Sequence, residues 1–220
     1  MKIIKDILGS TLIVALVAMA TFIAYEPNVS QAVEDQIVVT QLVTGEITIS
    51  SPSNVTMSPS IVGTTGNPGS PSTGYASWTI ITNNVSGFTA TLRASSTTMI
   101  GNVNGDIIDA YTAATAGVPD YTWDVPSGNA EFGYNATTTT AADLHQSFRN
   151  NGTACNDGAL MTTNNCWLAA STTAKILINR TTPTLVGGVI LGLKFQVELD
   201  GHSVTADTYV ATTTVTATTN

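Results

Sequence analysis

The sequence is poor in charged side chains. Asp, Glu, Lys and Arg make up 10% of its 220 residues, against roughly 25% in ordinary soluble domains. Acids outnumber bases, and the net charge of −8 argues against nucleic acid and anionic membranes as partners. Thr, Ser, Asn and Gly fill the polar positions. Such a surface suits an extracellular protein, although a β-rich protein uses Thr heavily in any compartment.

Histidine and cysteine are scarce, which limits the chemistry available. His145, His202 and a single pair of cysteines do not make up a thiol and imidazole metal site. His145 has Asp143 and Ser147 near it in the sequence, but residues two apart on a helix point in different directions, so a triad is not expected. The sequence shows no glycine-rich phosphate loop and no other cofactor signature.

The N-terminus has the layout of a secretory signal. Lys2 and Lys5 precede an uncharged apolar run, residues 7–25, which a Glu-Pro pair ends. We expect residues 1–32 to be removed, which leaves residues 33–220 as one domain. The run of 19 residues also approaches the roughly 20 of a membrane-spanning helix, so the alternative is an uncleaved anchor with the body outside.

Cys155 and Cys166 are the only cysteines of the chain. In an exported protein, an even pair this close in sequence is most simply a disulfide that closes a small loop.

The C-terminal part predicts two strands. Residues 191–200 alternate apolar and polar side chains, which is the two-residue period of a strand. Residues 209–219 are rich in β-branched side chains. We expect these two stretches to form the closing hairpin of a β-sandwich.

Residues 76–82 and 88–95 predict a second hairpin around an Asn-Asn-Val-Ser-Gly turn. Alternate residues form two stripes that we expect to face one core. The stripes hold Trp78, Ile80, Phe88, Ala90, Leu92 and Ala94.

The stretch from Gln36 to Thr44 is rich in Ile and Val and predicts a strand. It could pair within its own sheet as an ordinary first strand. In a polymer it could instead complete the sheet of the next subunit, which is the strand-addition mode of several pilus systems.

Residues 96–184 show weaker periodicity, and we interpret them as an insertion. Residues 141–149 predict one short helix, because Leu144 and Phe148 are four positions apart. The expected fold is therefore all-β, an immunoglobulin-like β-sandwich with an inserted, disulfide-stapled module that contains this helix.

Aromatic and acidic residues cluster in the same insertion. A glycan-binding site is predicted at Tyr121, Trp123, Tyr134 and Trp167. A glycan hydrolase would need two nearby carboxylates to converge, from Asp120, Asp124 and Glu131. The simpler interpretation is that the aromatic residues pack the insertion onto the sandwich.

One loop has the oxygen ligands of a calcium site at alternate positions, namely Asn102, Asn104, Asp106 and Asp109. The glycine falls in the wrong place and the bidentate Glu is missing, so the alternative is an Asn-Gly turn.

The strand at residues 45–52 with its Pro/Ser loop, the Trp-Thr-Ile-Ile strand from Trp78 and the threonine-rich end from Asp207 to Ala217 together resemble bacterial surface β-sandwich proteins. The chain looks most like WxL-type cell-wall-binding domains and fimbrial or biofilm-fibre subunits. Trp78 and Trp167 both depart from the Trp-X-Leu motif, so peptidoglycan binding does not carry over.

These observations lead to an exported, non-catalytic surface protein. We expect a subunit of a fibre or coat that self-associates through residues 36–44. The alternatives are a monomeric adhesin or glycan-binding module with a cell-wall or glycan ligand, and then a glycan hydrolase.

Overall fold

The computed structural model describes Met19 and residues 36–220. The expected export segment, residues 1–32, lies outside the described residues except for Met19. The chain divides into two units after residue 42, and every strand of the described chain belongs to the second, residues 43–220. Within Met19 and residues 36–220, no helix is long and apolar enough to cross a membrane.

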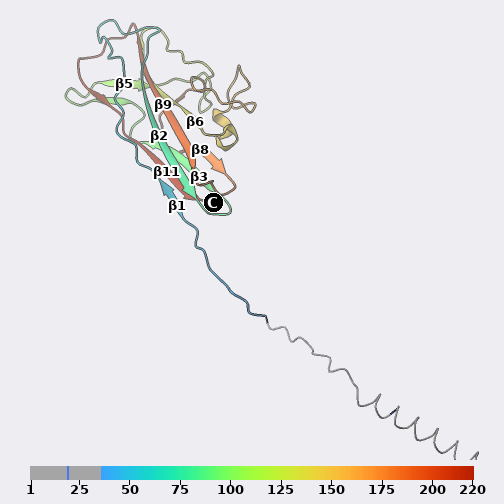
Figure 1. Ribbon diagram of the computed structural model, residues 1–220. Helices are drawn as coiled ribbons and strands as arrows, with labels where there is room; N and C mark the ends of the chain where they lie inside the picture. The colour runs from blue at the N-terminus through green and yellow to red at the C-terminus, as the bar shows by residue number, and fades with distance from the viewer. Residues whose placement is uncertain (1–18, 20–35) are drawn as a thin grey trace, which may run out of the picture. The chain divides into compact units, whose positions relative to one another are not determined.

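The fold is all-β, as expected, and its strands form two sheets in a sandwich-like arrangement (Figure 1). In chain order the strands are β1 (Ile47–Ile49), β2 (Ser72–Thr82), β3 (Phe88–Ala94), β4 (Met99–Gly101), β5 (Ile107–Ala110), β6 (Asn129–Thr138), β7 (Leu168–Ala169), β8 (Lys175–Arg180), β9 (Val189–Asp200), β10 (Tyr209–Val210) and β11 (Thr213–Thr219). The large sheet has the order β1-β2-β9-β6-β5-β4-β10, with β7 beside β6. The small sheet has the order β11-β3-β8.

The core lies between the sheets and is built from alternate residues of each strand. On β9 the odd-numbered residues from Val189 to Leu199 are buried, so the alternation predicted for this stretch is confirmed. The polar face of β9, however, is not fully exposed to solvent, since Gln196 and Glu198 are only 4% and 7% exposed. A further layer of chain therefore covers part of the outer side of the large sheet.

Neither expected hairpin forms. β9 pairs with β2 and β6, whereas β11 pairs with β3 in the small sheet. β2 and β3 likewise lie in different sheets. Their buried apolar residues therefore contribute to the core from two sheets and do not lie side by side in one. The period of a strand identifies its buried face but not its neighbour, because a facing sheet buries a stripe as well as an adjacent strand does.

Residues 96–184 supply strands to both sheets. β6 lies between β9 and β5 in the large sheet, and β8 pairs with β3 in the small one. β6 is buried on both faces, although in its sequence the core residues Ala130, Phe132, Tyr134 and Ala136 alternate with polar residues or glycine.

The prediction of a short helix at residues 141–149 is wrong. The chain forms two 3-10 turns there, η1 (Ala141–Asp143) and η2 (Gln146–Phe148). Leu144 and Phe148 are buried as their spacing indicated, but the backbone N–H of His145 donates to the carbonyl of Leu177 on β8 at 2.7 Å. An α-helix would need that N–H for its own ladder, so the contact with β8 prevents one.

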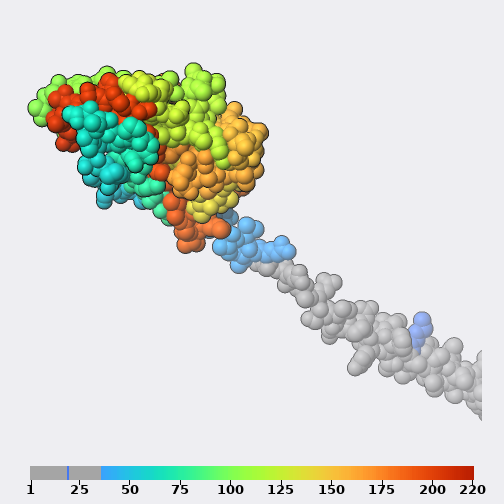
Figure 2. All heavy atoms as spheres, turned by 90° about the horizontal axis from the view of Figure 1, so that it is seen from above, coloured from blue at the N-terminus to red at the C-terminus, as the bar shows by residue number. Residues whose placement is uncertain are grey.

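A Pro-, Ser- and Gly-rich loop, residues 51–71, closes one side of the core. Val55 and Met57 are partly buried against the core, where they lie over Gly74 of β2. Figure 2 shows the cyan residues of this loop beside the red C-terminal residues. The backbone N–H of Val204 donates there to the carbonyl of Gly63 at 2.8 Å.

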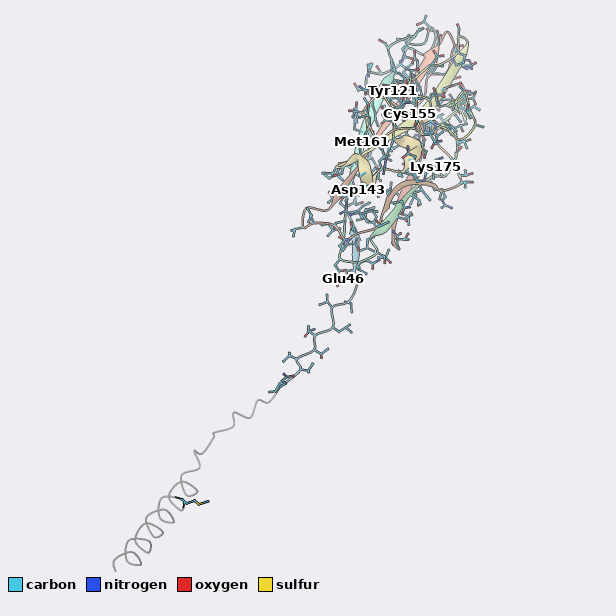
Figure 3. The ribbon with its side chains drawn as sticks, turned by 90° about the vertical axis from the view of Figure 1, so that its right-hand side faces the viewer. Glu46, Tyr121, Asp143, Cys155, Met161 and Lys175 are labelled. Carbon is cyan, nitrogen blue, oxygen red and sulfur yellow. A yellow bond between two sulfur atoms is a disulfide. The ribbon has the colours of Figure 1, made fainter. Side chains whose placement is uncertain are left out.

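The expected disulfide joins Cys155 and Cys166, with 5.6 Å between their Cα atoms. The backbone N–H of Cys166 donates to the carbonyl of Tyr121, and Figure 3 shows Cys155 and Tyr121 toward the end of the sandwich that lies away from Glu46. A disulfide suggests an oxidising environment.

Candidate functional site

The outer face of the large sheet carries most of the polar and aromatic residues of interest. The register of β6 and β9 places Asn135 beside Lys194, Gly133 beside Gln196 and Glu131 beside Glu198 on this face. Residues 111–127 and 161–167, which we call the outer layer, cover part of it. The outer layer is tied to the sheet by backbone bonds, for example from the N–H of Tyr111 to the carbonyl of Phe132 at 2.8 Å.

Three aromatic rings of the outer layer form a cluster. Tyr111 stacks on Trp123 with 4.5 Å between ring centroids, and Trp123 meets Trp167 edge to face at 5.2 Å. Gly133 of β6 lies beneath, and a Cβ there would meet Tyr111 Cβ at 2.9 Å and Trp123 Cζ3 at 3.0 Å. The missing side chain is what lets the cluster lie against the sheet. Burial and the nearby Asp120 carboxylate raise the pKa of the Tyr111 phenol.

The four aromatic residues predicted as a glycan patch are not brought together on the surface. Trp123 and Trp167 are in contact, but Trp167 is 1% exposed. Tyr134 is also buried, and it points to the core face of β6, where it packs against Phe148 at 5.8 Å. Tyr121 is half-buried. These residues pack the outer layer and the core, in line with the simpler interpretation of the sequence.

Two glutamates lie side by side under the outer layer. Glu131 is 1% exposed, and its Oε2 accepts from the backbone N–H of Thr112 at 3.0 Å. Glu198 accepts from the backbone N–H of Gly69 at 2.5 Å and from Trp123 Nε1 at 2.7 Å. Both carboxylates therefore hold neighbouring loops against the sheet through hydrogen bonds.

The three acids predicted for sugar cleavage take different positions. Asp124 lines a hollow of about 420 Å³ together with Trp123, Glu198 and Asp200. Asp120 and Glu131 do not line it. Asp120 instead accepts from the Tyr111 hydroxyl at 3.0 Å within the outer layer. Glu198, which the sequence did not single out, is the better buried carboxylate of this hollow.

A second hollow of about 190 Å³ lies further along the same face. It is lined by Tyr75, Ala76, Ser77, Asn135, Thr137, Thr163, Gly192, Leu193 and Lys194. Lys194 Nζ lies 5.6 Å from the ring centroid of Tyr75 and 5.4 Å from that of Trp167. None of these lining residues except Lys194 carries a charge, and none was predicted as a site from the sequence.

The oxygens of the expected calcium loop serve as hydrogen-bond acceptors. Asn104 Oδ1 accepts from the N–H of Asp106 at 2.8 Å, and Asp106 accepts from the N–H of Ile107 and of Thr205. These N–H groups, that of Thr205 above all, hold the pKa of the Asp106 carboxyl below its usual value.

Asn102 and Asp109 are exposed. Asp207 also binds this loop, because its Oδ2 accepts from the N–H of Val103 at 2.8 Å. Among the described residues, no three His, Cys, Asp or Glu side chains are grouped so that they could hold a metal ion. A turn held by side-chain oxygens accounts for the loop.

His145 and Ser147 are in contact, contrary to the expectation from helical geometry. His145 precedes the 3-10 turn η2, which contains Ser147, and His145 Nδ1 lies 2.6 Å from Ser147 Oγ. The carboxylate that could complete a triad is used elsewhere, since Asp143 accepts two bonds from Arg180 Nη1 at 2.7 and 2.8 Å. Within residues 36–220 no carboxylate is hydrogen-bonded to His145, and neither His145 nor Ser147 lines the two hollows.

Comparison with protein-family models, with curated proteins and with solved structures finds no match to this chain.

Proposed function

We propose that this chain is an exported cell-surface subunit that assembles into a fibre or coat by donating residues 36–44 to a neighbouring copy. The observation that carries the proposal is the state of this segment. Residues 36–46 belong to no strand. The large apolar side chains of the segment are 75 to 89% exposed, namely Ile37, Val38, Val39, Leu42 and Val43.

This segment has the composition of a buried strand without the burial. Fully burying one large aliphatic side chain contributes about 1.5–3 kcal/mol to stability. Burying these five exposed side chains against a partner would therefore stabilise the assembly considerably. Their β-branched side chains favour the extended conformation. A second copy that pairs with the segment would bury these side chains and satisfy its backbone.

We assign the acceptor edge to β11 of the small sheet. Within the described chain, β11 pairs with β3 and with no other strand, so its second edge has no ladder partner, although β1 lies close to β11. Val215 and Ala217 of β11 are only partly buried against the core. A strand added at this edge would complete the ladder and cover those residues.

Two further observations support a place outside the cell. The disulfide between Cys155 and Cys166 favours an oxidising compartment. The low charge and the Thr-rich surface of β11 suit an extracellular protein.

The test is negative-stain electron microscopy of residues 33–220 beside a chain that starts at Glu46. We expect filaments from the longer chain only. In the longer chain, Val39→Asp places a charge in the donated strand and should abolish filaments. The matched control is Val186→Asp, since Val186 is 98% exposed in a loop outside both the donor and the acceptor. Monomers of equal stability from both chain lengths would rule out the donated strand.

A further inference from the structure

We infer that the 190 Å³ hollow between Tyr75 and Lys194 binds one acidic sugar unit, a hexuronate of a surface polysaccharide. This inference concerns the outer face of the large sheet and does not depend on the strand exchange proposed above. Three features of the hollow carry it: its size and exposed ring, an unpaired buried amide oxygen, and a cation with no acidic partner.

The size of the hollow fits one six-membered ring. A cavity of about 150 Å³ is known to hold benzene, and this one measures about 190 Å³. Tyr75 is 61% exposed at its wall and offers an aromatic face for stacking. Gly192 contributes no side chain, and a Cβ there would meet Thr137 Oγ1 at 2.7 Å.

Asn135 gives the hollow a buried acceptor that lacks a donor. Its Nδ2 donates to the carbonyls of Thr163 and Asn165 at 2.5 and 3.3 Å, which fixes the orientation of the amide. Its Oδ1 is buried and has no hydrogen-bond partner within the described chain. Buried polar atoms are rarely left in this state, so the oxygen calls for a donor such as a sugar hydroxyl. Ser77 and Thr137 line the same hollow with further hydroxyls.

Lys194 gives the hollow its preference for an acid. Its ammonium lies over the rings of Tyr75 and Trp167 and donates to Asn164 Oδ1 at 2.8 Å. Within residues 36–220, no carboxylate lies within 4.0 Å of this ammonium, since the one ion pair there joins Arg180 and Asp143. In a chain with a net charge of −8, such an unneutralised cation marks where a carboxylate would bind.

These features combine in one pose. The sugar ring stacks on Tyr75, its carboxylate contacts Lys194, and a ring hydroxyl donates to Asn135 Oδ1. A neutral sugar would keep the stacking and the hydroxyl contact but lose the charge-assisted bond.

The test is an amide NMR titration of residues 33–220 with D-glucuronate and with D-glucose. We expect glucuronate to shift the amides of Tyr75, Gly192 and Lys194 with a Kd on the order of 1 mM, as suits a single small ligand. Glucose should bind the same residues about fivefold more weakly. Added salt should reduce that preference.

Variants separate the contributions. Tyr75→Ala should weaken both sugars roughly fivefold to tenfold, whereas Tyr75→Phe should retain binding. Lys194→Gln should remove the preference for glucuronate and leave glucose unchanged. Lys175→Gln is the matched control, because it removes the same charge from β8 in the small sheet.

Two results would overturn the inference. One is the absence of shifts at Tyr75, Gly192 and Lys194 with either sugar. The other is a glucuronate affinity that Lys194→Gln and Lys175→Gln lower equally, because this would reveal a general charge effect with no site. Neither result bears on filament formation, so the two proposals fail separately.

Discussion

Gly133 of β6 is where a single added methyl group should disturb the outer layer most. In Gly133→Ala, the new Cβ would lie 2.9 Å from the carbonyl oxygen of Leu168, 2.9 Å from Tyr111 Cβ and 3.0 Å from Trp123 Cζ3. The first two atoms are backbone or near-backbone and cannot move aside like the end of a flexible side chain. The outer layer must therefore shift away from the sheet.

The expected cost can be estimated from two opposing effects. Overpacking of this kind destabilises by about 1–3 kcal/mol. Replacing Gly by Ala inside a strand returns roughly 0.5–1 kcal/mol, because the unfolded chain loses freedom. We therefore expect Gly133→Ala to lower the free energy of unfolding by about 1–2 kcal/mol.

Urea unfolding followed by tryptophan fluorescence measures this change, and near-UV circular dichroism reports on the stacking of Trp123 itself. The control is Gly187→Ala, because nothing lies within 4 Å of a Cβ at Gly187 and its φ is not positive. That variant should be neutral or slightly stabilising. Equal urea midpoints and unchanged near-UV spectra for both variants would show that the aromatic cluster does not rest on Gly133.

Three further predictions concern the loops. Replacing both Cys155 and Cys166 by Ser should cost about 3 kcal/mol by the loop-entropy estimate, and a reductant should destabilise the wild type equally in urea melts. Burial, with the positive charges of two nearby side chains, lowers the pKa of His145 from 6.5. The unfolded chain therefore binds its proton first as the pH falls through 6.5, so stability should fall there, and His145→Gln should flatten this step in a pH series of urea midpoints. The N–H of Val103 is the main cause that lowers the pKa of Asp207. Asp207→Ala should lower the hydrogen-exchange protection factor of the Val103 amide, and acid should lower the same protection factor in the wild type as the pH drops below 3.8 and through the lowered pKa.

The faces of the strands could be predicted from the sequence, but their partners could not. The apolar positions from Phe88 to Ala94 and from Leu191 to Leu199 are buried, as their period indicated. The pairing of β9 with β6, whose partners are between 53 (Thr138 and Leu191) and 71 (Asn129 and Asp200) positions apart in the chain, depends on contacts that no local pattern records. The central place of β6 in the large sheet likewise depends on its pairing with β9 and β5, which its own alternation does not reveal.

The same limit applies to the candidate sites. The sequence showed Lys194 as part of a polar strand face, yet nothing local indicates that Tyr75 and Asn135 flank it. That neighbourhood arises from the registers Tyr75 to Lys194 and Asn135 to Lys194 in two separate strand pairs. The sequence showed that aromatic residues gather around Trp123. It did not show that they are buried, because their burial depends on the space that Gly133 leaves on the neighbouring sheet.

The two proposed surfaces are arranged so that they can act together. Strand addition at β11 would extend the small sheet, whereas the hollow at Tyr75 and Lys194 opens on the outer face of the large sheet. Glu46, where the donated segment joins the sandwich, lies toward the end away from Tyr121 (Figure 3). A filament would then present one hollow per subunit, and linked sites raise the avidity for a repeating polysaccharide by 10²–10⁴ over a single weak site. Filaments of residues 33–220 should accordingly cosediment with a polyuronate under conditions in which the chain starting at Glu46 does not. If the shorter chain binds glucuronate in solution but the filaments gain nothing, the hollow is covered in the assembly, and the added strand must lie on the large sheet instead of at β11.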